Sequence, residues 1–379
     1  MDIFLSALSS LGQGFANLTW QQALMTALGC LLLYLGIGKK IEPLLLLPIG
    51  FGIILGNLPL ASLSAYDQGG VINLLYNSGI LTELFPCLLF IGLGAMIDFG
   101  PMLANPSVLI FGAAGQFGIF LTLILALVLG FTKQQAVSVA IIGACDGPTA
   151  IYVASKFARE LLPAISIAAY SYMALVPIIQ PPIMRALTTK NERRIVMAYG
   201  VKKVSQKVKI LFPIVAAILT ILIAPMGAPL MGMLMLGNLL KESGVVKRLA
   251  EVSETTIANV VTLFLGLSIG ASMLGGNFLT WQTIMIFALG LLAIALDTVA
   301  GVCLGKIMCF ITKGKINPLL GAAGTSAFPM SSRVVQKEGQ RANPKTFLLF
   351  HAVGANTGGQ IGSVMAAATL LAVMAGLGL

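Results

Sequence analysis

The stretch Gly143-Ala144-Cys145-Asp146-Gly147-Pro148-Thr149-Ala150 places a Gly-Pro pair and an acid inside an apolar segment, residues 135–157. Proline lacks a backbone donor and clashes with the preceding turn, so the pair should end a helix. Irregular backbone persists at membrane depth only when it is buried in protein or lines a water-filled cavity. An ionisable side chain there costs roughly 3 kcal/mol and is functional by default. The stretch predicts a re-entrant hairpin carrying a functional Asp146; the alternative is that Asp146 only caps the next half-helix.

The composition sets the class of the protein. Of 379 residues, 58% are hydrophobic and 9% are charged, whereas a soluble domain carries about 25% charged residues. We therefore expect an all-α polytopic membrane protein, because only helices or closed barrels satisfy the backbone in lipid. This excludes a cytosolic enzyme, a nucleic-acid binder and a disordered chain. The net charge of +10 is typical of basic cytoplasmic loops.

Twelve apolar segments account for most of the length and leave no room for a separate soluble domain. They are residues 21–38, 43–60, 80–97, 107–131, 135–157, 163–184, 208–226, 228–240, 257–274, 281–303, 315–332 and 346–378. The pattern of residues 1–20 suits an amphipathic helix lying on the membrane interface.

Two halves of the chain resemble each other. PIGFGIILGNL (48–58) in the first half matches PLMGMLMLGNL (229–239) in the second. Four further matches keep the order and nearly the same spacing: LFIGL (89–93) with LFLGL (263–267), IIGA (141–144) with LLGA (319–322), Pro163 with Pro344, and Gln180 with Gln360. An internal duplication is predicted. We assign residues 21–187 to repeat 1, residues 188–206 to a cytoplasmic linker and residues 207–379 to repeat 2.

The number of crossings decides whether the second repeat is inverted. If segments 135–157 and 315–332 are re-entrant hairpins, each half crosses five times and repeat 2 is inverted. The strongly basic residues 185–209 should be cytoplasmic, and the hairpins then also place the basic residues 333–345 inside. The same arrangement places three basic residues on the outer side, contrary to the preference of Lys and Arg for cytoplasmic loops. These residues are Lys133, Lys156 and Arg159. Taken together, the positions of the basic residues favour ten crossings plus two hairpins.

Polar side chains near the breaks are candidate ion ligands. A single carboxylate, Asp146, among neutral oxygens suits Na+. Hydroxyls near the two breaks could contribute, with packing as the alternative for each: Thr149, Thr325, Ser326, Ser331 and Ser332. The last segment of each half, with YMALVPIIQPP (172–182) and GANTGGQIGS (354–363), is also expected to be broken. Asn356 there is an uncharged oxygen donor.

Other polar residues leave two interpretations open. Gln180 and Gln360 either ligate an ion or join helices. Tyr172 either forms a hydrogen bond near the ion or simply lies at an interface. For Tyr170 we expect only the interface position. Asp297 pairs by the repeat with Gln116, which suggests structural hydrogen bonding, with an ion role as the alternative.

Four stretches closely resemble one family. GACDGPTAIYVASKFA (143–158), SYMALVPIIQPPI (171–183), FPMSSRVVQKEGQ (328–340) and FHAVGANTGGQIGS (350–363) are similar to the beta subunit of sodium-pumping biotin-dependent decarboxylases. That family acts on oxaloacetate, methylmalonyl-CoA, glutaconyl-CoA or malonate. The resemblance extends from about residue 20 to residue 379, and does not say which acid is decarboxylated.

The resemblance implies a mechanism and a set of partners. A carboxyltransferase alpha subunit loads biotin, and a biotin-carrier protein brings carboxybiotin to the membrane subunit. Loss of CO2 there consumes a proton from the outer side and drives Na+ export. A small gamma or delta membrane subunit, a homotrimer, elevator-like scaffold and transport domains, and a bacterial inner membrane are also implied.

The resemblance also implies site residues. The essential aspartate of the family falls on Asp146 and its downstream tyrosine on Tyr172, both catalytic. Asn356 and Ser363 join Asp146 and Thr149 as Na+ ligands. Arg333 is our candidate to bind the carboxybiotin anion, with a topology-setting loop charge as the alternative.

Two rival functions are weighed against this one. The first is a stand-alone Na+- or H+-coupled secondary carrier of small organic anions, and the second is a structural anchor for a soluble complex.

Overall fold

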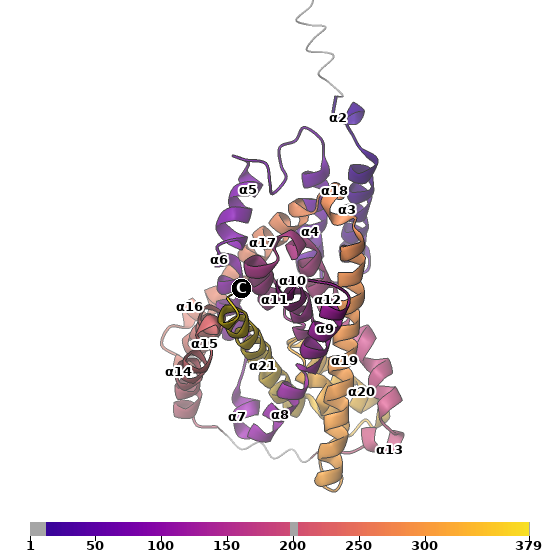
Figure 1. The fold of residues 1–379 in the computed structure, drawn as a ribbon. Helices are drawn as coiled ribbons and strands as arrows, with labels where there is room; N and C mark the ends of the chain where they lie inside the picture. The colour runs from indigo at the N-terminus through magenta and orange to yellow at the C-terminus, as the bar shows by residue number, and fades with distance from the viewer. Residues whose placement is uncertain (1–12, 198–203, 379) are drawn as a thin grey trace, which may run out of the picture. The chain divides into compact units, whose positions relative to one another are not determined.

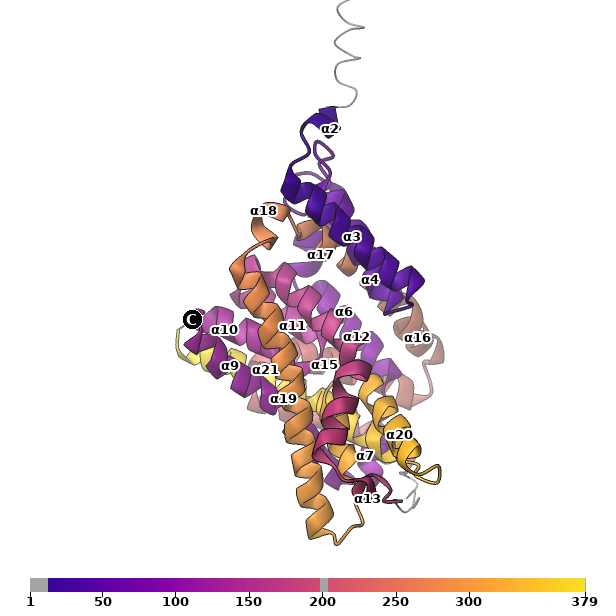
Figure 2. The ribbon, with the colours of Figure 1, turned by 90° about the vertical axis from the view of Figure 1, so that its right-hand side faces the viewer.

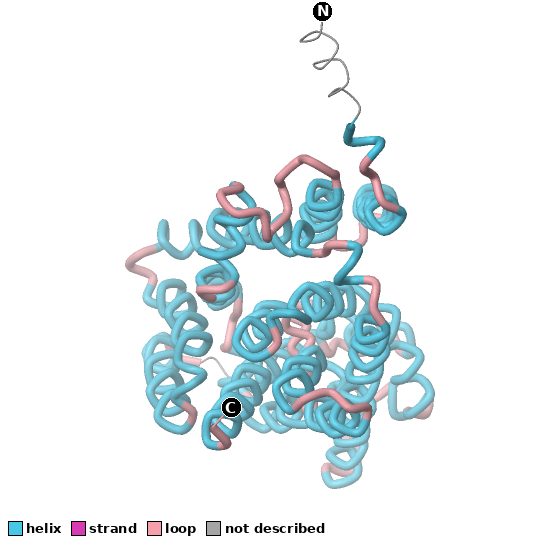
Figure 3. The backbone as a smooth tube through the Cα atoms, turned by 45° about the horizontal axis from the view of Figure 1, so that its top comes forward, coloured by secondary structure: helices cyan, strands magenta, loops and turns pink. Residues whose placement is uncertain are grey.

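The computed structural model describes residues 13–197 and 204–378. Throughout these residues the regular elements are helices, and none of them is a strand (Figures 1 and 3). The expected all-α architecture is confirmed. The proposed interfacial helix at residues 1–20 lies mostly outside the described residues, as does part of the linker.

In the described part of the chain, seven helical stretches are long and apolar enough to cross a membrane, so the chain is a multi-pass membrane protein. They are Trp20–Gly38, Pro106–Val128, Arg159–Leu187, Gln206–Ile223, Lys247–Ser272, Trp281–Ile311 and Leu349–Gly376. The pair Val71–Ile80 and Leu84–Met96, bent by 63°, counts as at most one more. Two other expected crossings form helices of only 15 and 16 residues, Pro43–Asn57 and Ala228–Ser243, shorter than the ~20 residues of a perpendicular span. The expected ten crossings correspond to these ten segments and stay a prediction.

The longer elements follow one another as α3 (Trp20–Gly38), α4 (Pro43–Asn57), α6 (Leu84–Met96), α8 (Leu109–Ala114), α9 (Phe117–Val128), α10 (Lys133–Ala140), α11 (Gly147–Phe157), α12 (Leu162–Leu187), α14 (Gln206–Ile223), α15 (Ala228–Ser243), α17 (Ala258–Ser272), α19 (Trp281–Ile311), α20 (Met330–Ala342) and α21 (Leu349–Gly376). Short helical turns join them, among them α2 (Gln13–Ala16), α5 (Val71–Leu75), α7 (Gly100–Ala104), α13 (Lys190–Arg193), α16 (Lys247–Glu251) and α18 (Gly275–Phe278).

One compact unit comprises the described residues up to Phe85 together with Asn259–Ile284. In it α3 packs along α4. The buried Asn57 at the end of α4 donates from Nδ2 to the carbonyl oxygen of Met273 at 2.8 Å and accepts from the backbone N–H of Gly275 at 3.0 Å. A helix of the first half is thereby tied to a segment of the second half.

The other unit, Pro86–Ala258 with Met285–Leu379, contains the mirror of this contact. Asn238, the counterpart of Asn57 in the matched stretches of the repeat, donates from Nδ2 to the carbonyl oxygens of Gly94 at 3.3 Å and Ile97 at 3.0 Å. Here a helix of the second half is tied to a helix of the first. Such reciprocal pairs are what a duplicated chain would produce; the inverted orientation of the halves stays a prediction.

Both predicted interruptions occur. The first is a 3-10 turn, Ile141–Ala144, followed by Cys145 in the left-handed conformation and Asp146 before α11 begins at Gly147. The second is the 3-10 helix Pro318–Gly324, followed by the extended Thr325 and a turn at residues 328–329 before α20 begins at Met330. Each break is flanked by helical limbs that pack on their neighbours within the same unit.

The expected breaks in the last segments of the two halves are wrong. α12 runs unbroken for 26 residues through Pro177, Pro181 and Pro182, and α21 runs unbroken for 28 residues through its glycines. Neighbouring helices can satisfy the carbonyls that proline frees inside a membrane protein. Figure 2 shows α12 beside the long helix α19, against which the ring of Tyr172 packs.

Candidate cation site

Asp146 lies at the first break, and its side chain collects hydrogen bonds from two helices. Its relative exposure is 4%. Oδ2 accepts from the hydroxyl of Thr149 at 2.5 Å, on α11, and from Gln360 Nε2 at 2.9 Å and Ser363 Oγ at 3.3 Å, both on α21. Asp146 stands at the N-cap position of α11, but its side chain makes no capping hydrogen bond there. Its contacts therefore extend beyond capping, to the last helix of the opposite half of the chain.

The second break meets α21 one to two turns before Gln360 and Ser363. Asn356 Nδ2 donates to the carbonyl oxygen of Thr325 at 2.6 Å, and Ser326 Oγ donates to that of Gly359 at 2.8 Å. Asn356 Oδ1 and Thr325 Oγ1 are buried and have no hydrogen-bond partner among the described residues. Neutral oxygens with unused lone pairs are therefore present where α21 meets the second break, close in sequence to the residues that hold Asp146.

Glycine makes this close approach possible. A Cβ added at Gly359 would lie 2.2 Å from the carbonyl oxygen of Gly324, and one added at Gly112 would lie 2.3 Å from the carbonyl carbon of Gly358. Real side chains do not fit at such distances, so backbones of α8, the second break and α21 touch directly. The glycines of residues 354–363 thus serve packing rather than a helix break.

The glutamines related by the repeat make reciprocal contacts. Gln360, in the last helix of the second half, donates to Asp146 in the first break. Gln180, in the last helix of the first half, donates from Nε2 to the carbonyl oxygen of Ala322 in the second break at 2.8 Å. Sequence reasoning left ligation and helix joining equally open for these residues, and in this structure both amides join a helix to the opposite break.

Two tyrosines lie near the first break in different ways. The hydroxyl of Tyr172 donates to the carbonyl oxygen of Phe287 on α19, and its ring packs against Gly290. The ring of Tyr170 covers Gly147, directly after Asp146, where a Cβ would come within 2.2 Å of it. The Tyr170 hydroxyl is buried and has no hydrogen-bond partner in the part of the chain that the structure describes. Sequence reasoning singled out Tyr172 and missed how close Tyr170 lies.

Asp297 and Gln116, the other polar pair related by the repeat, lie buried in the same unit. Asp297 Oδ1 accepts from the backbone N–H of Gly118. Gln116 Nε2 donates to the carbonyl oxygens of Gly112 and Gly359, each at 3.2 Å. Gln116 thereby joins α8 to α21, as structural hydrogen bonding predicts.

Arg333 lies on the first turn of α20, after the second break, and its side chain is exposed. Within residues 13–197 and 204–378 it forms no ion pair. The proposed site residues are therefore distributed in two groups. Thr149 and Ser363 both contact Asp146. Asn356 lies earlier on α21, and Tyr172 and Arg333 lie on α12 and α20.

Fold and site together define a polytopic membrane protein with a buried carboxylate at a helix break. The family model described as "Na+-transporting oxaloacetate decarboxylase beta subunit" matches residues 21–374. The chain belongs to this family of decarboxylase beta subunits, which the sequence resemblance had indicated.

Curated relatives match over nearly their whole length. The chain is 50% identical to glutaconyl-CoA decarboxylase subunit beta of Acidaminococcus fermentans, over 99% of this chain and 100% of the relative. It is 48% identical to methylmalonyl-CoA decarboxylase subunit beta of Veillonella parvula, over 99% of each. It is 45% identical to oxaloacetate decarboxylase beta chain 2 of Salmonella typhi, over 95% of this chain and 96% of the relative.

Proposed function

We propose that this chain decarboxylates carboxybiotin and couples the reaction to Na+ export, with uptake of a proton from the outer side. The observation that carries the proposal is the buried carboxylate of Asp146, held at a helix break by hydroxyl and amide groups. A carboxylate at membrane depth is costly unless a cation balances it. Either one Na+ or one proton neutralises the carboxylate, so the single side chain of Asp146 can exchange Na+ for a proton.

The proposed Na+ ligands are Asp146, Thr149, Ser363 and Asn356. The hydroxyls of Thr149 and Ser363 donate to Asp146 in this structure, and their oxygens keep lone pairs for a cation. Asn356 Oδ1 is buried without a hydrogen-bond partner among the described residues. Hydroxyl, amide and carboxylate oxygens are hard ligands, as a hard monovalent cation requires.

Decarboxylation breaks the bond between the ureido nitrogen of biotin and the carboxyl carbon. CO2 leaves, and the electron pair left on nitrogen takes up one proton. In our proposal Asp146 supplies that proton, and Arg333, exposed beyond the second break, binds the incoming carboxylate. Tyr172, whose hydroxyl donates to the carbonyl oxygen of Phe287 on α19, is the third proposed catalytic residue.

We further propose the assembly in which this reaction occurs. The partners are a biotin-carrier protein, a carboxyltransferase alpha subunit and a small gamma or delta membrane subunit, around a homotrimer of this chain in a bacterial inner membrane. The two repeats, residues 21–187 and 207–379, are inverted and form elevator-like scaffold and transport domains. The reciprocal contacts of Asn57 and Asn238 support duplication.

Reconstitution tests the function. Proteoliposomes that hold the purified complex should accumulate or expel Na+ against its gradient only when carboxybiotin is supplied by the carrier protein. A carrier of small organic anions would instead move its solute with no biotin protein present. Solute transport by this chain alone would overturn the proposal.

Sidedness tests the inverted repeat. Single cysteines in place of Lys247 and Lys337, in a cysteine-free background, should be protected from an impermeant thiol reagent in intact cells, and a cysteine in place of Gly378 should be labelled. Labelling of position 337 from outside would mean that the second interrupted segment crosses completely, and the inverted repeat would fail.

A further inference from the structure

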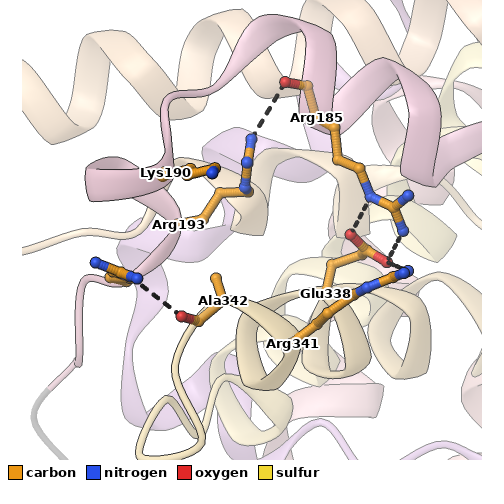
Figure 4. A pocket seen from close by; sticks show the side chains of 7 residues that line it. Arg185, Lys190, Arg193, Glu338, Arg341 and Ala342 are labelled. Atoms are coloured by element: carbon orange, nitrogen blue, oxygen red, sulfur yellow. Dashed lines mark hydrogen bonds and ion pairs between the residues drawn. The ribbon is translucent and has the colours of Figure 1, made fainter.

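Cationic side chains surround a cavity of about 350 Å³ where α12 leads into α13 and where α20 ends (Figure 4). These cations are Arg185, Lys190, Arg193, Arg194 and Arg341. Glu338 is the one acid in this lining, which leaves an excess of four positive charges. We call the cavity the basic pocket. None of its residues belongs to the group around Asp146.

Glu338 forms ion pairs with two arginines. Arg185 Nε donates to Glu338 Oε2 at 2.7 Å, and Nη2 of the same guanidinium reaches Oε1. Arg341 Nη1 lies 3.8 Å from Oε1. The hydrogen bonds from Arg185 hold the pKa of Glu338 below its usual range, so this carboxylate is charged at neutral pH. Its single negative charge is shared between Arg185 and Arg341.

The three remaining cations form no ion pair within the lining. Arg193 Nη1 donates to the carbonyl oxygen of Thr188 at 2.5 Å, and Arg194 Nε to that of Ala342 at 3.3 Å. Carbonyls orient these guanidinium groups without cancelling their charge. Lys190 makes no ion pair in the described part of the chain. Among the described residues, these three cations of the pocket form no ion pair with a carboxylate, and the two guanidinium groups are oriented by carbonyl oxygens.

We propose that the basic pocket binds a phosphate group presented at the cytoplasmic face. Arginine forks match phosphate oxygens, and several uncompensated cations favour a group with more than one negative oxygen. The volume falls in the range of small-ligand sites, roughly 300–1,000 Å³. Ala342 is the only apolar side chain of the lining, so the pocket lacks the apolar walls that the biotin ring would need.

The position of the basic pocket suits phosphate from either of two sources. It lies directly after the spanning helix α12, which ends at Leu187. Basic clusters immediately cytoplasmic of a span attract anionic headgroups. A soluble phosphate compound would reach the same cations from the cytoplasm. The phosphate chemistry is shared, and the relative affinities for a lipid probe and a soluble probe distinguish the sources.

The test measures binding to the purified full-length chain in detergent, by the shift of its thermal unfolding midpoint during titration. The probes are short-chain phosphatidylglycerol and pyrophosphate, with short-chain phosphatidylcholine as the zwitterionic reference. The double variant Lys190→Gln with Arg194→Gln should raise Kd on the order of tenfold or more. The variant leaves the Arg185–Glu338 pair in place. Tighter binding of phosphatidylglycerol identifies a lipid headgroup as the source, and tighter binding of pyrophosphate a soluble compound.

A matched control separates the pocket from general surface charge. Lys247→Gln with Arg248→Gln removes two exposed cations that do not line the pocket, and it should leave Kd unchanged within about twofold. If the double variant fails to fold, Lys190→Glu alone reverses one charge and leaves the arginine contacts in place. Equal weakening by the control pair, absence of saturable binding of both phosphate probes, or binding of a polyglutamate peptide in their place would overturn the proposal.

Discussion

The two interruptions of the chain, residues 141–146 and 318–329, share a backbone plan and differ in charge. Each is a 3-10 turn that receives a glutamine amide from the last helix of the opposite half. The first glutamine meets a carboxylate, Asp146, and the second meets a carbonyl, that of Ala322. The same backbone plan can therefore support one charged position and one neutral position. A second carboxylate would need its own cation, so the asymmetry suits a site that handles one charge at a time.

The largest expected effect comes from removing the charge at the first break. Asp146→Asn keeps the size of the side chain but removes the negative charge that attracts the cation. Na+-dependent decarboxylation and Na+ pumping should therefore fall at least on the order of 100-fold. Assembly of the complex should persist. The measurement is turnover and radioactive Na+ transport by the reconstituted complex, with Asp98→Asn, a half-exposed acid, as the control. Pumping close to the wild-type rate in Asp146→Asn would remove the proposed site.

At the second break the expected effect is on stability rather than on charge. A Cβ at Gly324 would lie 2.0 Å from the carbonyl oxygen of Phe111, and overpacking of this kind costs about 2 kcal/mol. Gly324→Ala should therefore lower the thermal unfolding midpoint of the purified chain. Gly276→Ala, where nothing lies within 4 Å, is the control and should leave the midpoint unchanged. An unchanged midpoint in Gly324→Ala would mean that the second break does not pack its backbone tightly against its neighbours.

Competition between Na+ and protons tests whether the first break holds a single exchangeable charge. A protonated Asp146 has no negative charge to offer Na+, so apparent Na+ affinity should weaken as pH falls, by up to about tenfold per pH unit in the range where one proton competes with one Na+. The measurement is the Na+ dependence of decarboxylation between about pH 5.5 and 9. A half-saturating Na+ concentration that does not change with pH would place the proton and Na+ on separate groups, and Asp297 would be the next candidate.

The smallest expected effect distinguishes the two glutamines. Hydrogen bonds to a charged acceptor are about twice as strong as those between neutral groups. Gln360→Leu should thus change the half-saturating Na+ concentration by about tenfold, whereas Gln180→Leu, which loses a bond to a carbonyl, should change it less than about twofold. Both variants should lower the unfolding midpoint, Gln360→Leu by the larger amount. Equal effects of the two variants on Na+ dependence would mean that the charge difference between the breaks does not matter for the cation.

Local sequence was enough to predict several features of the fold. Gly-Pro after an acid predicted the first break, and the match of IIGA with LLGA predicted its counterpart, because proline and glycine act on their own turn of the chain. The matched stretches that carry Asn57 and Asn238 predicted a duplication, and the reciprocal contacts of the two residues are consistent with it. The low charge content predicted the all-helical membrane class, since lipid requires internal hydrogen bonding of the backbone.

Features that depend on what lies across the fold could not be predicted in this way. Three prolines that would end an isolated helix lie inside the unbroken α12, and the local sequence does not show which groups satisfy the carbonyls that these prolines free. Whether Tyr170 or Tyr172 lies nearer Asp146 depends on the rotation of α12 against α11, which two positions in one helix do not reveal.

The sequence by itself determined the membrane class, the family, the two breaks and the fact that only the first break carries an acid, Asp146, because each depends on composition or on adjacent residues. Only the tertiary structure decided which donors meet Asp146, since Gln360 and Ser363 reach it from the last helix of the opposite half. It also brought residues 185–194 beside residues 338–342 to form the basic pocket. Contacts between distant segments depend on the packing of whole helices, and no short stretch of sequence contains that information.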